Sequence, residues 1–126
     1  MSRRLLLWAP PLLLLLYEIY LSSQSVLPSF PIHFSQIDKL EHAAYFFLMT
    51  TFAYRALRFG EGWGRAAAAA AISCGALAYG ALDEWHQSFV PFRDVDPWDV
   101  VADTTGAIVA AIVSERLWAC FERPAG

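Results

Sequence analysis

The chain has 126 residues, of which 57% are apolar and 17% are charged, whereas soluble domains average about 45 to 50% apolar and about 25% charged residues. A soluble domain of this length exposes much of its surface and therefore needs more polar residues. The composition argues against an ordinary small soluble protein. The net charge of −3 also gives no support to a basic nucleic-acid-binding protein, so we expect no nucleic acid as a partner.

Four segments almost free of charge predict an all-α protein. Extended at their ends, they predict helices at about residues 5–21, 37–56, 64–86 and 98–119. A helix of about 20 residues, rising about 1.5 Å per residue, crosses a membrane core of roughly 30 Å. We therefore predict a single domain over residues 1–126, a bundle of four transmembrane helices in the cytoplasmic membrane.

The first segment contains Pro10 and Pro11, which predict a kink or a late start of the helix. Small residues recur in the third and fourth segments, where they would let membrane helices approach closely. These are Ala71 and Gly75, Ala76 and Gly80, and then Gly106, Ala107, Ala110 and Ala111.

Two alternatives to transmembrane helices fit the apolar segments less well. A soluble four-helix bundle should carry a polar stripe with helical period, and residues 66–82 have none. A cleaved signal peptide would explain Arg3 and Arg4 before an apolar run. That run, however, is long, contains the proline pair and Glu18, and is not followed by an Ala-x-Ala cleavage site. A retained membrane helix is the preferred interpretation.

The basic residues predict an orientation, because cytoplasmic loops of membrane proteins are enriched in Lys and Arg. Seven of the nine flank the inner ends of the four segments, and only Lys39 and Arg93 fall in the other two loops. Both termini are therefore expected in the cytoplasm, with residues 22–41 and 83–99 facing outward. Cys74 and Cys120 fall at different depths, so no disulfide is expected, and both are interpreted as packing residues.

The outward loops hold most of the chain's ionisable chemistry, including all three histidines, His33, His42 and His86. Helical spacing predicts three polar faces at one depth. They consist of Asp38, His42 and Tyr45; of Tyr79, Asp83, His86 and Gln87, with Glu84 beside them; and of Asp99, Asp103 and Gly106.

Many of these charges have a simpler explanation as solvated or capping groups at helix ends, above all Glu41, Asp94 and Asp96. Residues bordering apolar runs are stronger candidates, since an unpaired ionisable group at that depth is costly. Glu18, about three residues from the outer end of the first helix, is expected either to pair with Lys39 or Arg93 or to reach outward to water.

Three motifs together resemble the VanZ-like family of small membrane proteins. They are Asp38-Lys39-Leu40-Glu41-His42 with Tyr45, the run from Asp83 to Arg93, and Asp99 to Gly106, with Ser22-Ser23-Gln24 as a further match. The resemblance implies a four-helix integral membrane protein. The family is named for a protein associated with resistance to the glycopeptide teicoplanin. This chain departs from the pattern at Asp103, where the family commonly has Asn.

The outward side carries two basic and nine acidic residues, a balance that suits a cation better than a bare anion. Carboxylates with one or two imidazoles could hold Mg, Mn or Zn, so a divalent metal is a possible cofactor, with Asp38, His42, Asp83 and Glu84 as candidate ligands.

Three classes of function remain open. The first is a binding protein whose outer face recognises an envelope component, such as a lipid-linked precursor or a glycopeptide. The second is a metal-assisted enzyme acting on a lipid-linked phosphate or glycan precursor, with His42 and Glu84 as acid and base and Lys39 and Arg93 holding phosphate. The third, an ion or proton pathway, has few polar residues in the inner half of the bundle to support it.

Overall fold

The computed structural model describes residues 2–25 and 37–122, and this part of the chain is helical almost throughout. Its elements are α1 (Arg3–Ser22), α2 (Ile37–Arg55), the short π-helix η1 (Ala56–Gly60), α3 (Arg65–Gln87) and α4 (Pro97–Glu122). The predicted all-α fold is confirmed. The observed helices differ from the expected ranges by only a few residues at each end.

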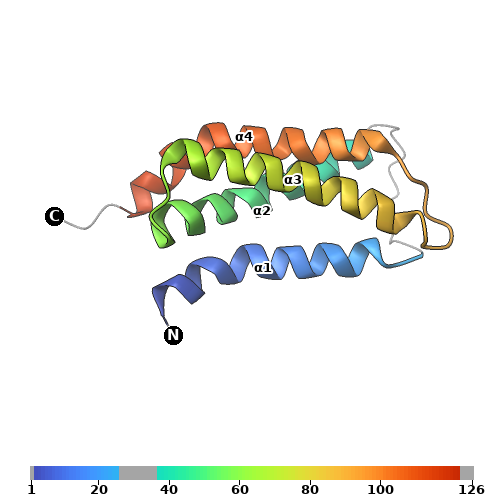
Figure 1. Ribbon diagram of the computed structural model, residues 1–126, viewed down its shortest axis with the longest axis horizontal. Helices are drawn as coiled ribbons and strands as arrows, with labels where there is room; N and C mark the ends of the chain where they lie inside the picture. Colours follow the sequence, from blue (N-terminus) through green and yellow to red (C-terminus); the bar gives the residue numbers. More distant parts are fainter. Residues whose placement is uncertain (1, 26–36, 123–126) are drawn as a thin grey trace.

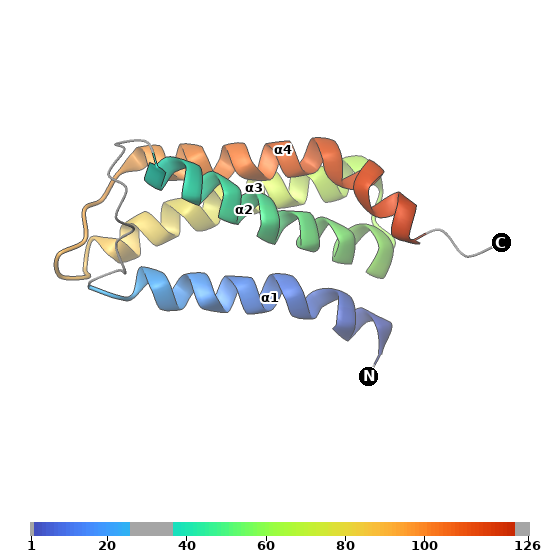
Figure 2. The same cartoon turned by 180° about the vertical axis from the view of Figure 1, so that it is seen from behind.

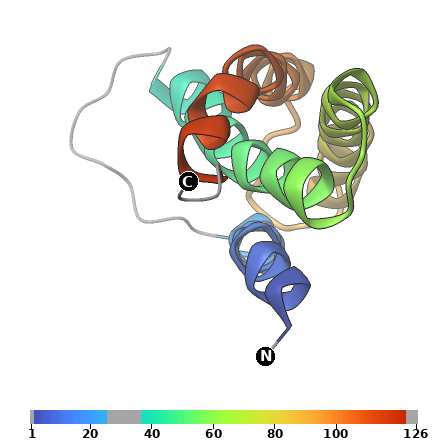
Figure 3. The same ribbon diagram turned by 90° about the vertical axis from the view of Figure 1, so that its left-hand side faces the viewer.

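The helices run roughly alongside one another, and α1 lies at the edge of the bundle (Figures 1 and 2). The most extensive interface joins α2 to α4, the next joins α3 to α4, and α1 contacts mainly α2. The end-on view shows α2, α3 and α4 grouped together, with α1 beside them (Figure 3). The largest part of the packed interior therefore belongs to the last three helices.

The bundle has two chemically different ends. Ser22, Ile37, Gln87 and Pro97 mark one end, which we call the acidic end. The start of α1, η1 and the end of α4 lie together at the other end, which we call the arginine end (Figure 1). This arrangement brings the three expected polar faces to the same end of the molecule.

The tight α2–α4 interface depends on a glycine. A Cβ atom built on Gly106 would overlap the backbone carbonyl of Ala43 and also crowd the backbone nitrogen of Phe47. On α3, a Cβ on Gly80 would lie 3.0 Å from Asp103 Oδ2 and 3.5 Å from Val100 Cα of α4. Both glycines let helix backbones approach closely, as the small-residue pattern predicts.

The same pattern does not hold for every small residue. Gly75 is exposed and would have no atom within 4 Å of an added Cβ, so it does not mediate a close helix contact. Cys74 and Cys120 are free, as expected, but both are exposed. Their predicted role in packing is wrong, because the helix faces that carry them point away from the bundle.

The proline pair does not delay the first helix. α1 begins at Arg3 and continues through Pro10 and Pro11. The Ser2 hydroxyl accepts a hydrogen bond from the Leu5 backbone N–H at 3.4 Å, which caps the helix start. Of the two outcomes expected from the proline pair, a kink or a late start, the late start is not found.

The distribution of polarity differs from that of a soluble bundle. Large apolar side chains are exposed along the outside, including Leu13 at 65% and Ile112 at 72% exposure. By contrast, six polar side chains are buried near the acidic end: Ser22, Asp83, Glu84, Gln87, Asp99 and Asp103. α1 and α3 are long and apolar enough to cross a membrane. Together these features are consistent with a membrane protein, whose outer surface contacts lipid.

Ion pairs close the arginine end. The Glu122 carboxylate lies 2.5 Å from an Arg3 nitrogen and 2.6 Å from an Arg55 nitrogen, which connects α1, α2 and α4. Glu115 accepts a hydrogen bond from the Tyr54 hydroxyl at 2.7 Å and pairs with Arg58 at 3.1 Å. The acidic side chains at this end therefore have arginine partners.

Candidate functional site

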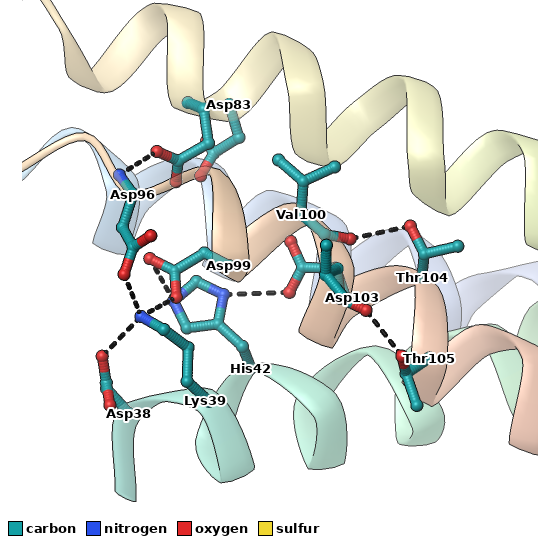
Figure 4. Close-up of polar contacts among 12 residues, drawn as sticks. Asp38, Lys39, His42, Asp83, Asp96, Asp99, Val100, Asp103, Thr104 and Thr105 are labelled. Atoms are coloured by element: carbon teal, nitrogen blue, oxygen red, sulfur yellow. Dashed lines mark hydrogen bonds and ion pairs between the residues drawn. The ribbon is translucent and has the colours of Figure 1, made fainter. Parts of the chain in front are cut away.

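Lys39 occupies the centre of a charged cluster at the acidic end (Figure 4). Its ammonium nitrogen lies 2.7 Å from Asp38 Oδ2, 2.7 Å from Asp96 Oδ2 and 2.6 Å from Asp99 Oδ1. These three carboxylates come from the start of α2, the loop before α4 and the first turn of α4. An ammonium group has three N–H donors, so this arrangement leaves none for a phosphate.

The carboxylate of Asp96, in the loop before α4, has a lowered pKa. A hydrogen bond from Lys39, followed by one from the Trp98 backbone N–H, holds the pKa of Asp96 below its ordinary value. Asp96 therefore stays ionised in mildly acidic solution and can maintain its contact with Lys39.

His42 lies one helical turn after Asp38 and faces α4 (Figure 4). Its Nδ1 atom lies 2.9 Å from Asp103 Oδ1, and its Nε2 atom lies 3.8 Å from Asp99 Oδ2. Asp103 is 3% exposed. Its contact with the imidazole is therefore the main interaction that offsets the cost of burying this carboxylate. The carboxylate of Asp103 thus orients the imidazole of His42.

The end of α3 carries two further carboxylates, of which one is bonded to this cluster. The Gln87 side-chain amide donates to Asp83 Oδ2 at 2.8 Å within the helix. Glu84 accepts a hydrogen bond from the backbone N–H of Asp96 at 2.7 Å. Glu84 therefore holds the loop between α3 and α4 in place, and it does not line the pocket described next.

A pocket of about 210 Å³ opens between α1, α2 and the α3–α4 loop. We call it the outer pocket; its lining residues are Glu18, Leu21, Ser22, Glu41, His42, Tyr45, Phe46 and Arg93. Ser22 is 2% exposed, and neither its hydroxyl nor the buried Nε of Arg93 has a hydrogen-bond partner in residues 2–25 and 37–122. Buried polar groups normally have such partners, so these two atoms can serve a ligand.

Glu18 faces the outer pocket together with Arg93. Among the described residues it forms no ion pair with Lys39 or Arg93, so the expected direct pairing is not found. Tyr45, one turn beyond His42, donates its hydroxyl hydrogen to the Leu14 carbonyl at 2.5 Å. This bond fastens α2 to α1 at the floor of the pocket.

Two predicted site residues lie elsewhere. His86 is exposed, and its Nε2 atom lies 3.3 Å from the Ser23 hydroxyl at the end of α1. It is therefore separate from the His42 cluster. His33 lies outside the described residues.

The proposed metal ligands do not converge. In the part of the chain that the structure describes, no group of three or more His, Cys, Asp or Glu side chains is arranged to hold a metal ion. Each of the four candidates has another partner: Asp38 pairs with Lys39, His42 with Asp103, Asp83 with Gln87, and Glu84 with the loop backbone. The candidate ligands are therefore engaged by other residues of the chain.

Asp96 is the member of the charged cluster that sequence reasoning assigned to the solvated loops. Its Oδ1 atom accepts a hydrogen bond from the Trp98 N–H at 2.9 Å, and Pro97 is the first residue of α4. An Asp before a Pro is a helix-start signal. That signal could have located Asp96 at the helix end, close to Asp99.

A family model described as VanZ/LLP1 matches residues 5–118. The match covers α2 and α3 completely, most of α1 and α4, and every described residue of the charged cluster and the outer pocket. No curated protein and no solved structure matches the chain.

Proposed function

The chain belongs to the VanZ/LLP1 family, and from this premise we propose that it crosses the cytoplasmic membrane four times and binds a polar component of the cell envelope in its outer pocket. The observation that carries the proposal is the pocket itself. Charged groups of both signs face it, and it holds two buried polar atoms without partners among the described residues.

Exposed apolar surface on all four helices supports four crossings. Besides α1 and α3, α2 exposes Leu48 at 45% and α4 exposes Ile112 at 72%. Apolar side chains of this size are stable outside a bundle when lipid surrounds it. At about 1.5 Å per residue, the 26 residues of α4 reach across a core of roughly 30 Å.

The proposed orientation in the membrane rests on the unequal distribution of basic residues between the two ends of the bundle. Among the described residues, the arginine end carries six of the eight basic ones, which supports a cytoplasmic location of this end and of both termini. A fluorescent reporter that folds only in the cytoplasm, fused after Gly126, should therefore be bright. A reporter inserted after Ser25 should be dark, and the reverse pattern would contradict the orientation.

Ligand binding is tested by the molecules that co-purify with the protein. Full-length protein extracted from its host membrane is compared with Arg93→Gln, in which the pocket loses its guanidinium. The matched control is Arg116→Gln, the same change at an exposed position of the other end. A compound enriched with wild type and Arg116→Gln but depleted with Arg93→Gln supports the proposal. Identical profiles for all three overturn it.

Acid–base catalysis is a second candidate, favoured by one observation. His42 lines the outer pocket and its imidazole is oriented by Asp103 at 2.9 Å, an arrangement suited to proton transfer. The second acid or base expected in such an enzyme, Glu84, points to the loop backbone instead. Turnover of a co-purifying compound that is lost in His42→Gln, with its binding retained, would favour the enzyme over the binding protein.

The resistance associated with the family's namesake gives a cellular test. We propose that occupancy of the outer pocket underlies any effect on glycopeptide susceptibility. Cells that produce the wild-type chain should then need more teicoplanin for inhibition than cells that produce Arg93→Gln at equal abundance. Equal inhibitory concentrations would separate this chain from the resistance phenotype.

A further inference from the structure

A second cavity continues from the outer pocket toward the arginine end. It has a volume of about 250 Å³ and lies between α1, α2 and α3. We call it the α1 cleft and define it by Trp8, Pro11, Leu15, Phe46, Gly75 and Tyr79. Phe46 lines both cavities, so its ring marks the point where the apolar cleft meets the polar pocket.

One face of α1 lines both cavities. Trp8, Pro11 and Leu15 face the cleft, and Glu18 and Ser22 face the pocket. These positions are spaced by three or four residues and therefore form a single stripe along the helix. The stripe changes from apolar to polar between Leu15 and Glu18. From Trp8 to Glu18 it extends about 15 Å, roughly half of a 30 Å hydrocarbon core.

The cleft is open at its side. Leu12 lines it and is 49% exposed, and Gly75, which also lines it, is exposed with no atom within 4 Å of an added Cβ. At this depth in a membrane the neighbouring medium is lipid, so an acyl chain can enter sideways.

The charges of the outer pocket indicate the headgroup. Glu18, Glu41 and Arg93 line it, and none of the three forms an ion pair within residues 2–25 and 37–122. Other charged groups at this end, such as Lys39 and Asp99, are paired. A pocket with two carboxylates and one guanidinium complements a group that carries both an amine and a phosphate.

We infer that the α1 cleft and the outer pocket together hold one lipid molecule, with an acyl chain in the cleft and a zwitterionic amine–phosphate headgroup in the pocket. The phosphate lies toward Arg93 and the amine toward Glu18. The inference rests on the proposed binding function and identifies the class of its ligand.

Native mass spectrometry of the full chain in detergent tests the inference with three probes: phosphatidylethanolamine, phosphatidylglycerol with the same chains, and free phosphoethanolamine. Wild type should bind one phosphatidylethanolamine at least tenfold more tightly than phosphatidylglycerol. Gly75→Leu fills the cleft and should weaken that binding at least tenfold. The matched control is Ala70→Leu, an exposed position of α3 that does not line the cleft, and it should bind as wild type does.

Two variants of the outer pocket test the amine and the phosphate of the headgroup one at a time. Glu18→Gln should weaken phosphatidylethanolamine binding and leave phosphatidylglycerol unchanged, whereas Arg93→Gln should weaken both. Equal affinity of wild type for the two lipids overturns the zwitterionic headgroup. Unchanged phosphatidylethanolamine binding by Gly75→Leu overturns the chain in the cleft.

Failure of the inference is distinguishable from failure of the proposed function. Binding of free phosphoethanolamine that Arg93→Gln abolishes and Gly75→Leu preserves would leave the outer pocket as a binding site but overturn the lipid. If no probe binds and Arg93→Gln also leaves the co-purifying compounds unchanged, both the lipid and the proposed function are overturned.

Discussion

Gly106 of α4 lies directly against the backbone carbonyl of Ala43 in α2, with no space for a Cβ atom between them. Gly106→Ala must therefore push apart the two helices that share the most extensive interface. We expect its free energy of unfolding in mixed micelles to fall by about 1 to 3 kcal/mol. Gly75→Ala is the control, because an added Cβ there meets nothing within 4 Å. Its helix propensity should raise stability by up to about 1 kcal/mol. Equal losses in both variants would contradict the observed contact.

Lys39→Met removes the one cation that three carboxylates share. Asp99 is 8% exposed and would be left charged without its partner, which we expect to cost about 2 kcal/mol in the free energy of unfolding. Asp38 and Asp96 are more accessible to water and add little. Adding Asp99→Asn to Lys39→Met should recover part of the loss, since the unpaired charge is then gone. If the double variant loses more free energy of unfolding than the two single variants lose together, the result argues against direct pairing.

Glu84 distinguishes a structural role from a catalytic one. Glu84→Gln keeps a side-chain oxygen that can accept the hydrogen bond from the Asp96 backbone, so stability should change by less than about 1 kcal/mol. Glu84→Ala loses the acceptor and leaves the loop N–H without its partner, with an expected cost of about 1 to 3 kcal/mol. Both are measured by unfolding in mixed micelles. If the chain has a measurable turnover, Glu84→Gln should retain it, and its complete loss in a folded variant would return Glu84 to the list of catalytic candidates.

Glu122 connects α1 to the other helices at the arginine end. Glu122→Gln weakens the ion pairs with Arg3 and Arg55, and because Arg3 is largely exposed most of the loss should come from Arg55. We expect a decrease of about 1 kcal/mol in the free energy of unfolding. Hydrogen exchange should become faster in the first turns of α1, while the acidic end stays unchanged. Faster exchange across all helices would instead indicate a global role.

Acid should weaken the loop contact with Lys39. The folded pKa of Asp96 is lowered by its hydrogen bond with Lys39, whereas the unfolded value is about 3.9. The stabilisation is therefore complete above the unfolded pKa and is lost as pH falls through the lower folded pKa. Asp96→Asn should make stability less dependent on pH below about 4, as measured by unfolding at a series of pH values. The same pH profile for both proteins would show that the contact contributes nothing.

The helices and the end at which the polar residues gather could be predicted from sequence, because membrane insertion and helical spacing act locally. Helical spacing alone predicts the faces that carry Asp38, His42, Asp99 and Asp103. In the structure His42 lies close to Asp99 and Asp103, and Asp38 is linked to Asp99 through Lys39. Spacing within a helix does not fix its rotation against a neighbour. For that reason the partners of Glu18 and His86, the exposure of both cysteines and the use of Lys39 inside the charged cluster could not be deduced. They depend on how each helix is rotated against the helices beside it.

The prediction of a metal site illustrates the same limit. Sequence gives a count of carboxylates at one end but not the direction in which each points. His42 pairs with Asp103, 61 positions away, and Glu84 bonds the backbone of Asp96, 12 positions away. Only the packed helices reveal these pairings.

Because Lys39 pairs with Asp99, a fragment of the chain must contain both residues to fold stably by itself. The two residues are 60 positions apart, and α3 lies between them in sequence. A fragment that ends after α2 would leave the ammonium without Asp96 and Asp99, and one that begins at α3 would leave those carboxylates without their cation. The first and second halves are therefore not two independent hairpins, and we expect neither to insert stably when produced alone.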